Sequence, residues 1–361
     1  MRRKKNPPIP PLSKGGEGGL RDLGEFGLIK RISKRSRIRD SSVMVGIGDD
    51  AAVITPPSPP LNKGGMGGVA PLLITTDSLV EDVHFRRDSP PEALGWKALA
   101  VNISDIAAMG GMPKHYLLSL SVPEGISVDY LDRLFAGMTD AARRHGLSLI
   151  GGDTTSSPDR IYISVTVIGE ASKNILLRKG AKAGDQIFVT GTLGDSALGL
   201  RMLEESGVGS WELGVKDLKL KTIINRHLRP VPRVKEGILL ANSGTITSMI
   251  DISDGLLADL GHICEESKVG ATVWADKIPL SKGFKSLSDR FGGIDLALSG
   301  GEDYELLFTV NGKEVKNFLS EAKGVKSTHI GEITKGKGVR VVGKDGQLHI
   351  PQRSGYEHFK G

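Results

Sequence analysis

Hydrophobic and polar residues follow two periods along this chain and predict strands alternating with helices. Residues 161–168 alternate strictly, and shorter apolar runs end on glycine, threonine or aspartate. Proline at 90 and 91 marks the start of one helix, and Gly146 marks the end of another. The first half is predicted to hold strands at 44–47, 72–74, 116–122, 147–150 and 161–168, and helices at 24–32, 92–109 and 128–145.

The pattern changes between residues 170 and 180, where a basic, glycine-containing stretch follows the last alternating strand. We therefore predict an N-terminal domain at 22–170 and a C-terminal α/β domain at 171–361. The second is predicted to hold strands at 186–190, 246–250, 305–310 and 329–333, and helices at 213–228, 234–241, 256–266 and 314–322.

Two Pro/Gly-rich segments, residues 7–19 and 56–68, are near copies of one another, PPIPPLSKGGEGG and PPSPPLNKGGMGG. Neither has periodic apolar positions that could support packing. We interpret 1–21 as a disordered basic tail and 55–71 as a loop inserted between two strands, where added length costs little free energy. A proline-rich ligand for a partner domain is the alternative.

Charge and composition exclude several classes of protein. The net charge is +6, but five basic residues and one acidic residue lie within residues 1–20, and aromatic residues make up only 5%. Nucleic-acid binding is therefore not expected. No apolar run is long enough for a membrane span, and the basic start lacks the apolar segment of a secretory signal. The single cysteine, Cys264, also favours the cytoplasm.

Carboxylates accompanied by hydroxyls or glycines recur at predicted strand ends, turns and helix ends. They are Asp49, Asp77, Asp105, Asp153, Asp251 and Asp254. Capping of backbone amides explains single members, such as Asp254 at a helix start, but not the whole set. No cysteine cluster or paired-histidine spacing accompanies them, so oxygen ligands and Mg²⁺ are favoured over zinc. The pattern predicts Mg²⁺-dependent phosphate chemistry without a P-loop.

Six motifs, in this order and spacing, resemble those of the thiamine-monophosphate kinase family. They are GIGDDAAV, ITTDSLVEDVHF, NISDIAAMGG, GGDTT, DISDGL and SGGEDYEL. This family is related to aminoimidazole ribonucleotide synthetase, selenophosphate synthetase and a hydrogenase maturation protein. The resemblance covers about residues 22–360 and excludes the second Pro/Gly segment.

The resemblance implies a two-domain synthetase-like fold of the α/β (α+β) class, whose N-terminal strands close a barrel between the subunits of a homodimer. It also implies transfer of the γ-phosphoryl group of ATP directly, in line, to thiamine monophosphate, the final step in making thiamine diphosphate. No catalytic base is expected, because the acceptor phosphate is already anionic.

The family's binding residues carry over onto the matching positions of this chain. The implied metal ligands are Asp49, Thr75, Thr76, Asp77, Asp105, Asp153, Asp251 and Asp254. The implied ATP contacts are Gly152, Asp153, Arg178 and Ser253, and the implied contacts to thiamine monophosphate are His84, Glu302 and Tyr356. In the same motif, Glu81 and Asp82 are interpreted as solvated side chains rather than ligands.

Two alternatives stay open at this point. A sibling ATP-dependent enzyme of the same superfamily would act on another acceptor, although the reactive cysteines expected of two such siblings do not match the position of Cys264. The second alternative is a protein that binds phosphate or a nucleotide without catalysis. Such a protein would not need to retain every carboxylate of the set.

Overall fold

By its internal packing the chain divides into two units, Met1–Arg37 with Glu357–Gly361, and Ile38–Tyr356. The structure is a computed structural model, and it describes residues 25, 27–30, 32–33, 40–56, 70–206, 218–351, 353 and 355–358. The predicted tail at 1–21 and most of the predicted loop at 55–71 lie outside these residues. In the first unit, residues 25, 27–30 and 32 of the helix expected at 24–32 are helical, and so is residue 33.

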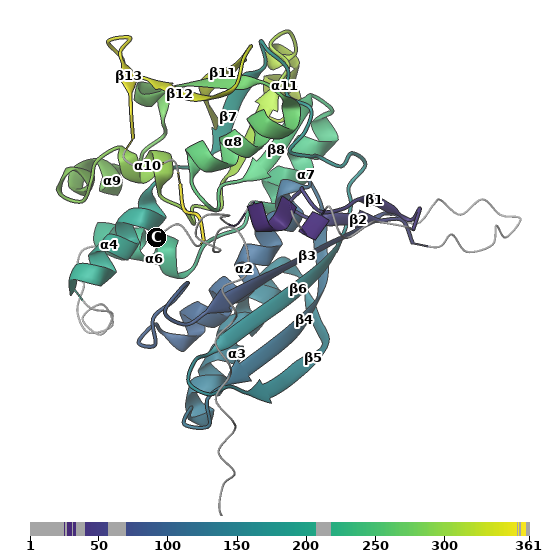
Figure 1. The fold of residues 1–361 in the computed structure, drawn as a ribbon, viewed down its shortest axis with the longest axis vertical. Coiled ribbons are helices and arrows are strands. Elements are labelled where there is room, and N and C mark those ends of the chain that lie inside the picture. Colours follow the sequence, from purple (N-terminus) through teal and green to yellow (C-terminus); the bar gives the residue numbers. More distant parts are fainter. Residues whose placement is uncertain are drawn as a thin grey trace, which may run out of the picture. The chain divides into compact units, whose positions relative to one another are not determined.

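The first sheet of the larger unit has six strands in the order β1-β2-β3-β6-β4-β5. Neighbours pair antiparallel except β4 and β5, which are parallel. The strands are β1 Val43–Val45, β2 Ala52–Ile54, β3 Leu72–Val80, β4 Met112–Val122, β5 Ser148–Ser156 and β6 Tyr162–Glu170. Helix α2 (Pro91–Ala108) packs against this sheet, and α3 (Val128–His145) packs against α2 (Figure 1).

Two strands extend further than their apolar runs predicted. Strand β3 continues through Thr75–Asp77 to Val80, and β5 continues through Gly151–Asp153 to Ser156. The predicted polar strand ends are therefore interior strand positions. Hydrogen bonding to β6 and β4 sustains both strands where their own hydrophobic pattern has already stopped.

Helix α2 is enclosed by the rest of the larger unit. Every residue of it is buried except Glu92 and Asp105. It packs against α3 and the first sheet, and it also contacts β8 (Ile246–Asp251) and α7 (Val234–Ser243) of the second half. Most residues of this helix are apolar, which suits burial on nearly all sides. Asp105, which is half-buried, is thus one of the two positions at which this helix is not fully covered.

The second sheet has seven strands in the order β13-β12-β9-β11-β7-β10-β8, and only β9 and β12 are parallel. Its remaining strands are β7 Gln186–Thr190, β9 Gly270–Trp274, β10 Leu306–Val310, β11 Ser327–Thr334, β12 Gly338–Val342 and β13 Leu348–His349. The larger helices of this half are α4 Asp195–Ser206, α6 Leu218–Leu228, α7, α8 Leu256–Ser267 and α11 Val315–Glu321. Short helices are α9 Lys282–Leu287 and α10 Asp295–Ser299, with single 3₁₀ turns at Ala275–Lys277 and Ser288–Arg290.

Two hydrophobic clusters cover this sheet. One joins the sheet to α4, α6 and α8, and the other joins it to α7 and α11. The C-terminal half thus mixes strands and helices, as the sequence predicts, and strands β9, β12 and β13 are additional to the predicted strands. Among the helices that the structure describes, none combines the length and apolar character needed to cross a lipid bilayer.

Candidate functional site

Three aspartates from distant parts of the sequence converge in the larger unit. Asp50 lies in the turn between β1 and β2, Asp105 lies in α2, and Asp251 ends β8. Each offers a carboxylate oxygen, and these oxygens all lie within 4.8 Å of one another. Asp50 and Asp251 are buried, and Asp105 is half-buried. We call these three residues the acidic cluster.

Short hydrogen bonds fix each carboxylate of the acidic cluster. Thr75 donates from its hydroxyl to Asp105 Oδ2 at 2.6 Å. Ser104 donates from its hydroxyl to Asp251 Oδ2 at 2.6 Å. The guanidinium of Arg178 donates to Asp50 Oδ1 through Nη2 at 2.6 Å and Nε at 3.1 Å. Asp50 Oδ2 is buried and has no hydrogen-bond partner among the described residues.

Burial and mutual repulsion oppose ionisation of these carboxyls. Burial, helped by the charge of Asp50, raises the pKa of Asp251 to about 8. Burial and the charges of Asp77 and Asp251 raise the pKa of Asp105 well above its usual range. Burial also raises the pKa of Asp50, against the attraction of Arg178. Carboxyls this close repel one another when ionised, and a cation between them removes that repulsion.

Of the other predicted metal ligands, three lie beside the acidic cluster. Asp49 precedes Asp50 and accepts a hydrogen bond from the backbone N–H of Arg178 at 3.1 Å. Burial and the charge of Asp50 raise the pKa of Asp49 to about 6. Thr75 contacts Asp105 directly, and the charge of Asp77 acts on the same carboxyl. The backbone N–H of Asp77 is held by Asn102 Oδ1 of α2 at 2.9 Å.

Thr76 and Asp153 lie on the opposite face of the first sheet. Thr76 donates to the carbonyl of Val165 and contacts the hydroxyl of Thr166. Asp153 is paired with Ser119 of β4, and that row continues to Ser164 and Ser78, away from α2. Asp153 also lies three strands from β3, or roughly 14 Å at ordinary strand spacing. One chain does not bring these two side chains to the acidic cluster.

The turn between β8 and α8 holds the predicted residues Ser253 and Asp254. Asp259, one turn into α8, accepts hydrogen bonds through Oδ2 from the N–H groups of Ser253, Asp254 and Gly255 at 3.0–3.2 Å. The side chain of Asp259 therefore holds the backbone of this turn in place. Oxygen or nitrogen atoms of Asp254, Asp259 and His262 lie within 4.8 Å of one another, so Asp254 sits in a second group of potential ligands.

Two of the three predicted contacts to thiamine monophosphate, Glu302 and Tyr356, are hydrogen-bonded to this same turn. The N–H of Glu302 donates to the carbonyl of Ser253 at 2.7 Å, and the N–H of Tyr356 donates to the next carbonyl, of Asp254, at 2.9 Å. Gly301 permits the close approach, because a Cβ there would lie 2.4 Å from the Ser253 carbonyl oxygen. Tyr356 is 48% exposed, so its ring is accessible to a ligand.

His84 lies in a tight turn that follows β3. The N–H of His84 donates to the Val80 carbonyl at 2.9 Å, and the N–H of Val80 donates to His84 Nδ1 at 3.0 Å. In the neutral ring this bond places the proton on Nε2. The backbone therefore selects the tautomer of His84.

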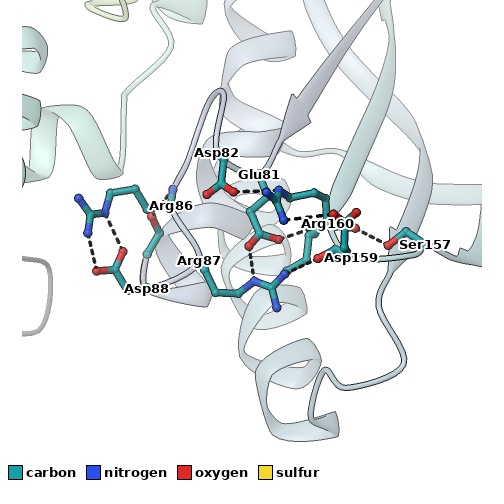
Figure 2. A network of polar contacts seen from close by, with 10 residues as sticks. Glu81, Asp82, Arg86, Arg87, Asp88, Ser157, Asp159 and Arg160 are labelled. Carbon is teal, nitrogen blue, oxygen red and sulfur yellow. Dashed lines mark hydrogen bonds and ion pairs between the residues drawn. The ribbon is translucent and has the colours of Figure 1, made fainter. Parts of the chain in front are cut away.

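A network of hydrogen bonds and ion pairs joins the His84 turn to the turn between β5 and β6 (Figure 2). Glu81 is 3% exposed and accepts hydrogen bonds from Arg87 Nε and from the N–H of Ile161. Arg87 Nη2 donates to the carbonyl of Asp159 at 2.6 Å, and Arg160 pairs with Asp82 at 2.8 Å. The interpretation of Glu81 as a solvated side chain is wrong, because Arg87 and the Ile161 amide compensate its burial.

The site residues predicted from the sequence do not include Asp50, Ser104 or Asp259. Asp50 was visible as the second half of an Asp-Asp pair, and Ser104 as a polar residue in an apolar helix. The sequence contains no signal for Asp259, because its role is to accept hydrogen bonds from a turn that only the folded structure brings to it.

Gly152 also has a structural role. A Cβ at this position would lie 1.9 Å from the carbonyl oxygen of Leu118 in β4, so the close pairing of β4 and β5 requires glycine here.

Comparison with known proteins identifies the family of this chain. The family AIR synthase related protein, N-terminal domain, matches residues 48–171, and its C-terminal domain counterpart matches residues 182–344. The thiamine-monophosphate kinase of Aquifex aeolicus is 40% identical over 347 residues, covering 94% of this chain and 99% of that protein. That of Bacillus subtilis is 40% identical over 345 residues, covering 94% and 100%.

The chain belongs to the thiamine-monophosphate kinase family. Among solved structures, AaThiL complexed with AMPPCP and TMP matches with a TM-score of 0.79 and 36% identity, covering 95% of this chain and all of that one. Escherichia coli HypE, a hydrogenase maturation protein, matches with a TM-score of 0.60 at 20% identity over 77% of this chain and 84% of that one. The second likeness shows a shared fold alone. The two family matches show that this member of the thiamine-monophosphate kinase family has both the N-terminal and the C-terminal domain of AIR synthase related proteins.

Proposed function

We propose that the protein transfers the γ-phosphoryl group of ATP to thiamine monophosphate and so forms thiamine diphosphate. The observation that carries the proposal is the acidic cluster, built from β1–β2, α2 and β8 of a chain in the thiamine-monophosphate kinase family. Phosphoryl transfer needs positioning and charge neutralisation more than covalent chemistry from the protein. A group of buried oxygen ligands serves both needs.

The residues present fit magnesium. All three residues of the acidic cluster offer carboxylate oxygens, and Asp50 Oδ2 is buried without a hydrogen-bond partner among the described residues. Bound Mg²⁺ would neutralise charge on the transferred phosphate. Within one chain, the ligands we assign are Asp49, Asp50, Thr75, Asp77, Asp105, Asp251 and Asp254. Thr76 and Asp153 lie on the other face of the first sheet, and we assign them as ligands on the face where we place a second copy.

The remaining assignments divide between the two substrates. Gly152, Asp153, Arg178 and Ser253 would contact ATP. His84, Glu302 and Tyr356 would contact thiamine monophosphate. His84 suits an acceptor phosphate, because its proton on Nε2 can be donated to a phosphate oxygen. That oxygen is already anionic near neutral pH, so direct in-line transfer needs no general base.

A homodimer is part of the proposal. Strand β5 is an edge strand, and all nine of its residues are exposed, including Leu149 and Ile150 at 52% and 54%. Such an edge favours pairing with another strand. The outward positions of Thr76 and Asp153 support a second copy on this face, with an intersubunit barrel as its form. We also propose the domain division at residues 170 and 171.

The test is incubation of the purified protein with ATP, Mg²⁺ and thiamine monophosphate, with thiamine diphosphate quantified by chromatography. Product is expected only when all three components are present. Controls omit Mg²⁺ or replace thiamine monophosphate with thiamine. Lack of product together with turnover of a different phosphorylated acceptor would assign the protein to a sibling activity. ATP binding without turnover of any acceptor would make it a nucleotide-binding protein.

A further inference from the structure

Lys97 is a buried cation inside α2. Only 4% of the residue is exposed, and its neighbours along the helix are almost all apolar. A buried ammonium group requires a charged or hydrogen-bonding partner. Its Nζ lies 2.6 Å from Oε1 of Glu302. A side chain of α2, in the N-terminal half, therefore forms an ion pair with a carboxylate of the C-terminal half.

The other oxygen of Glu302 is also occupied. His227 in α6 is 7% exposed, and its Nδ1 lies 3.1 Å from Glu302 Oε2 and 3.2 Å from the hydroxyl of Ser196. Burial, followed by the charge of Lys97, lowers the pKa of His227. The lowered pKa favours the neutral ring, in which an Nδ1–H group can donate a hydrogen bond to Glu302.

These two partners keep Glu302 ionised. Burial by itself would raise the pKa of Glu302, but the ammonium of Lys97 and the ring of His227 outweigh it and hold that pKa well below its usual range. About a quarter of the side chain, 27%, remains exposed. A carboxylate has about four acceptor positions, so two contacts leave capacity for a ligand.

The backbone of Glu302 is fixed as well. Its φ is +67°, a left-handed conformation that non-glycine residues adopt at a cost in free energy. The hydrogen bond to Ser253 and the close packing of Gly301 hold it there. Interactions within the protein thus fix the position, orientation and charge of the Glu302 carboxylate without a ligand.

We infer that Lys97 and His227 are positioning residues, which present Glu302 as an oriented carboxylate to the organic part of the phosphorylated acceptor. This inference rests on the proposed function, in which Glu302 contacts thiamine monophosphate. The ligand chemistry that fits is an amino-substituted or positively charged heterocycle, because an ionised carboxylate with both oxygens fixed accepts N–H donors and attracts cations. Neither positioning residue needs to touch the ligand.

The decisive variant is Lys97→Met, which keeps most of the stem and removes the charge. The KM for thiamine monophosphate and its calorimetric Kd are expected to rise at least about 10-fold, which corresponds to about 1.4 kcal/mol. The KM for ATP and kcat at saturating acceptor are expected to stay within about 2-fold, because the lost interaction acts on acceptor binding. Lys97→Arg retains the charge and is expected to recover much of the affinity.

A double-variant cycle separates positioning from general stability. In a Glu302→Gln background, Lys97→Met is expected to change the acceptor Kd by less than about 2-fold, because its target is already gone. The double variant also lacks the unpaired buried charge, so it serves if Lys97→Met alone fails to fold. Lys114→Met, which breaks an exposed pair with Glu170, is the matched control.

Two results would overturn the inference. They are an unchanged acceptor Kd in Lys97→Met, and a further large loss on adding Lys97→Met to Glu302→Gln. Failure of the proposed function has a different signature, since the wild-type protein would then form no thiamine diphosphate. In that case the Kd values for thiamine monophosphate still decide whether Lys97 acts through Glu302, and absence of binding by the wild-type protein contradicts the inference.

Discussion

The hydroxyl of Ser104 donates a 2.6 Å hydrogen bond to Asp251, a residue 147 positions further along the chain. Ser104 belongs to the helix packed on the first sheet, and Asp251 ends an edge strand of the second. Both side chains are buried. This one bond therefore joins the two halves of the larger unit inside the acidic cluster.

Replacing Ser104 by alanine tests that bond. Ser104→Ala leaves a buried carboxylate oxygen without its donor, and we expect a loss of about 1–3 kcal/mol in the free energy of unfolding. The Mg²⁺ concentration for half-maximal activity is expected to rise as well. Urea unfolding and a Mg²⁺ titration measure the two effects. Ser248→Ala removes a buried hydroxyl bonded to Thr309 and should affect only the unfolding.

Asp77 provides the sharpest test of the metal assignment. Asp77→Ala removes an exposed carboxylate and no core volume, so the protein should remain folded while kcat falls by more than about 100-fold. Steady-state assays at increasing Mg²⁺ measure this, with circular dichroism as the check on folding. Asp132→Ala, on the exposed side of α3, is the control. Activity like that of the wild type at saturating Mg²⁺ would refute the assignment.

The network of hydrogen bonds and ion pairs at the His84 turn predicts a selective effect on the KM for thiamine monophosphate. Arg87→Met removes the partner of the buried Glu81 and the contact to the Asp159 carbonyl. The turn should loosen, so the KM for thiamine monophosphate should rise several-fold while the KM for ATP stays unchanged. Arg86→Met breaks only an exposed pair with Asp88 and is the control. Equal changes in both KM values would instead indicate a general loss of structure.

His145 predicts part of the pH dependence of stability. Burial, followed by the charge of Arg144, lowers the pKa of His145 from 6.5 to about 4 in the folded protein. Folding therefore favours the neutral ring. The resulting stabilisation is complete above pH 6.5 and is lost as the pH falls from 6.5 towards 4.

We expect this loss to be about 1–2 kcal/mol, after allowance for solvent screening at a half-buried ring. Urea unfolding at several pH values measures it. His145→Phe keeps an aromatic ring beside Trp96 and cannot be protonated, so its stability should change less over that interval. An identical pH dependence in the variant would contradict the assignment.

The duplicated Pro/Gly segment predicts tolerance to deletion. Ile54 and Leu72, on either side of it, are direct partners in the β2–β3 pairing. Deleting residues 56–68 leaves four residues between them, enough for a hairpin connection. Turnover should remain within about 2-fold of the full chain in the standard assay. A large loss would show that the segment has a functional part.

Elements with local end signals could be predicted closely from the sequence. Helix α3 begins and ends where expected, because Ser127 caps its first turn and Gly146 adopts the left-handed conformation at its end. Strand β7 also has its predicted bounds at Gln186–Thr190. Strand β9 was missed, since its place in the sheet comes from pairing with β11 and β12, which are distant in sequence.

The acidic motifs and the family they indicate were determined by the sequence alone, because residue type and spacing along the chain are local properties. Only the tertiary structure decided which of these residues meet. It brought Asp50 into the acidic cluster, turned Thr76 and Asp153 to the other face of the sheet, and paired Lys97 with Glu302. For the two strand residues the physical reason is register: side chains alternate across a strand, so non-local pairing fixes the face on which each one lies. For Asp50 and Lys97 the reason is tertiary packing, which brings a turn and a helix against residues distant in sequence.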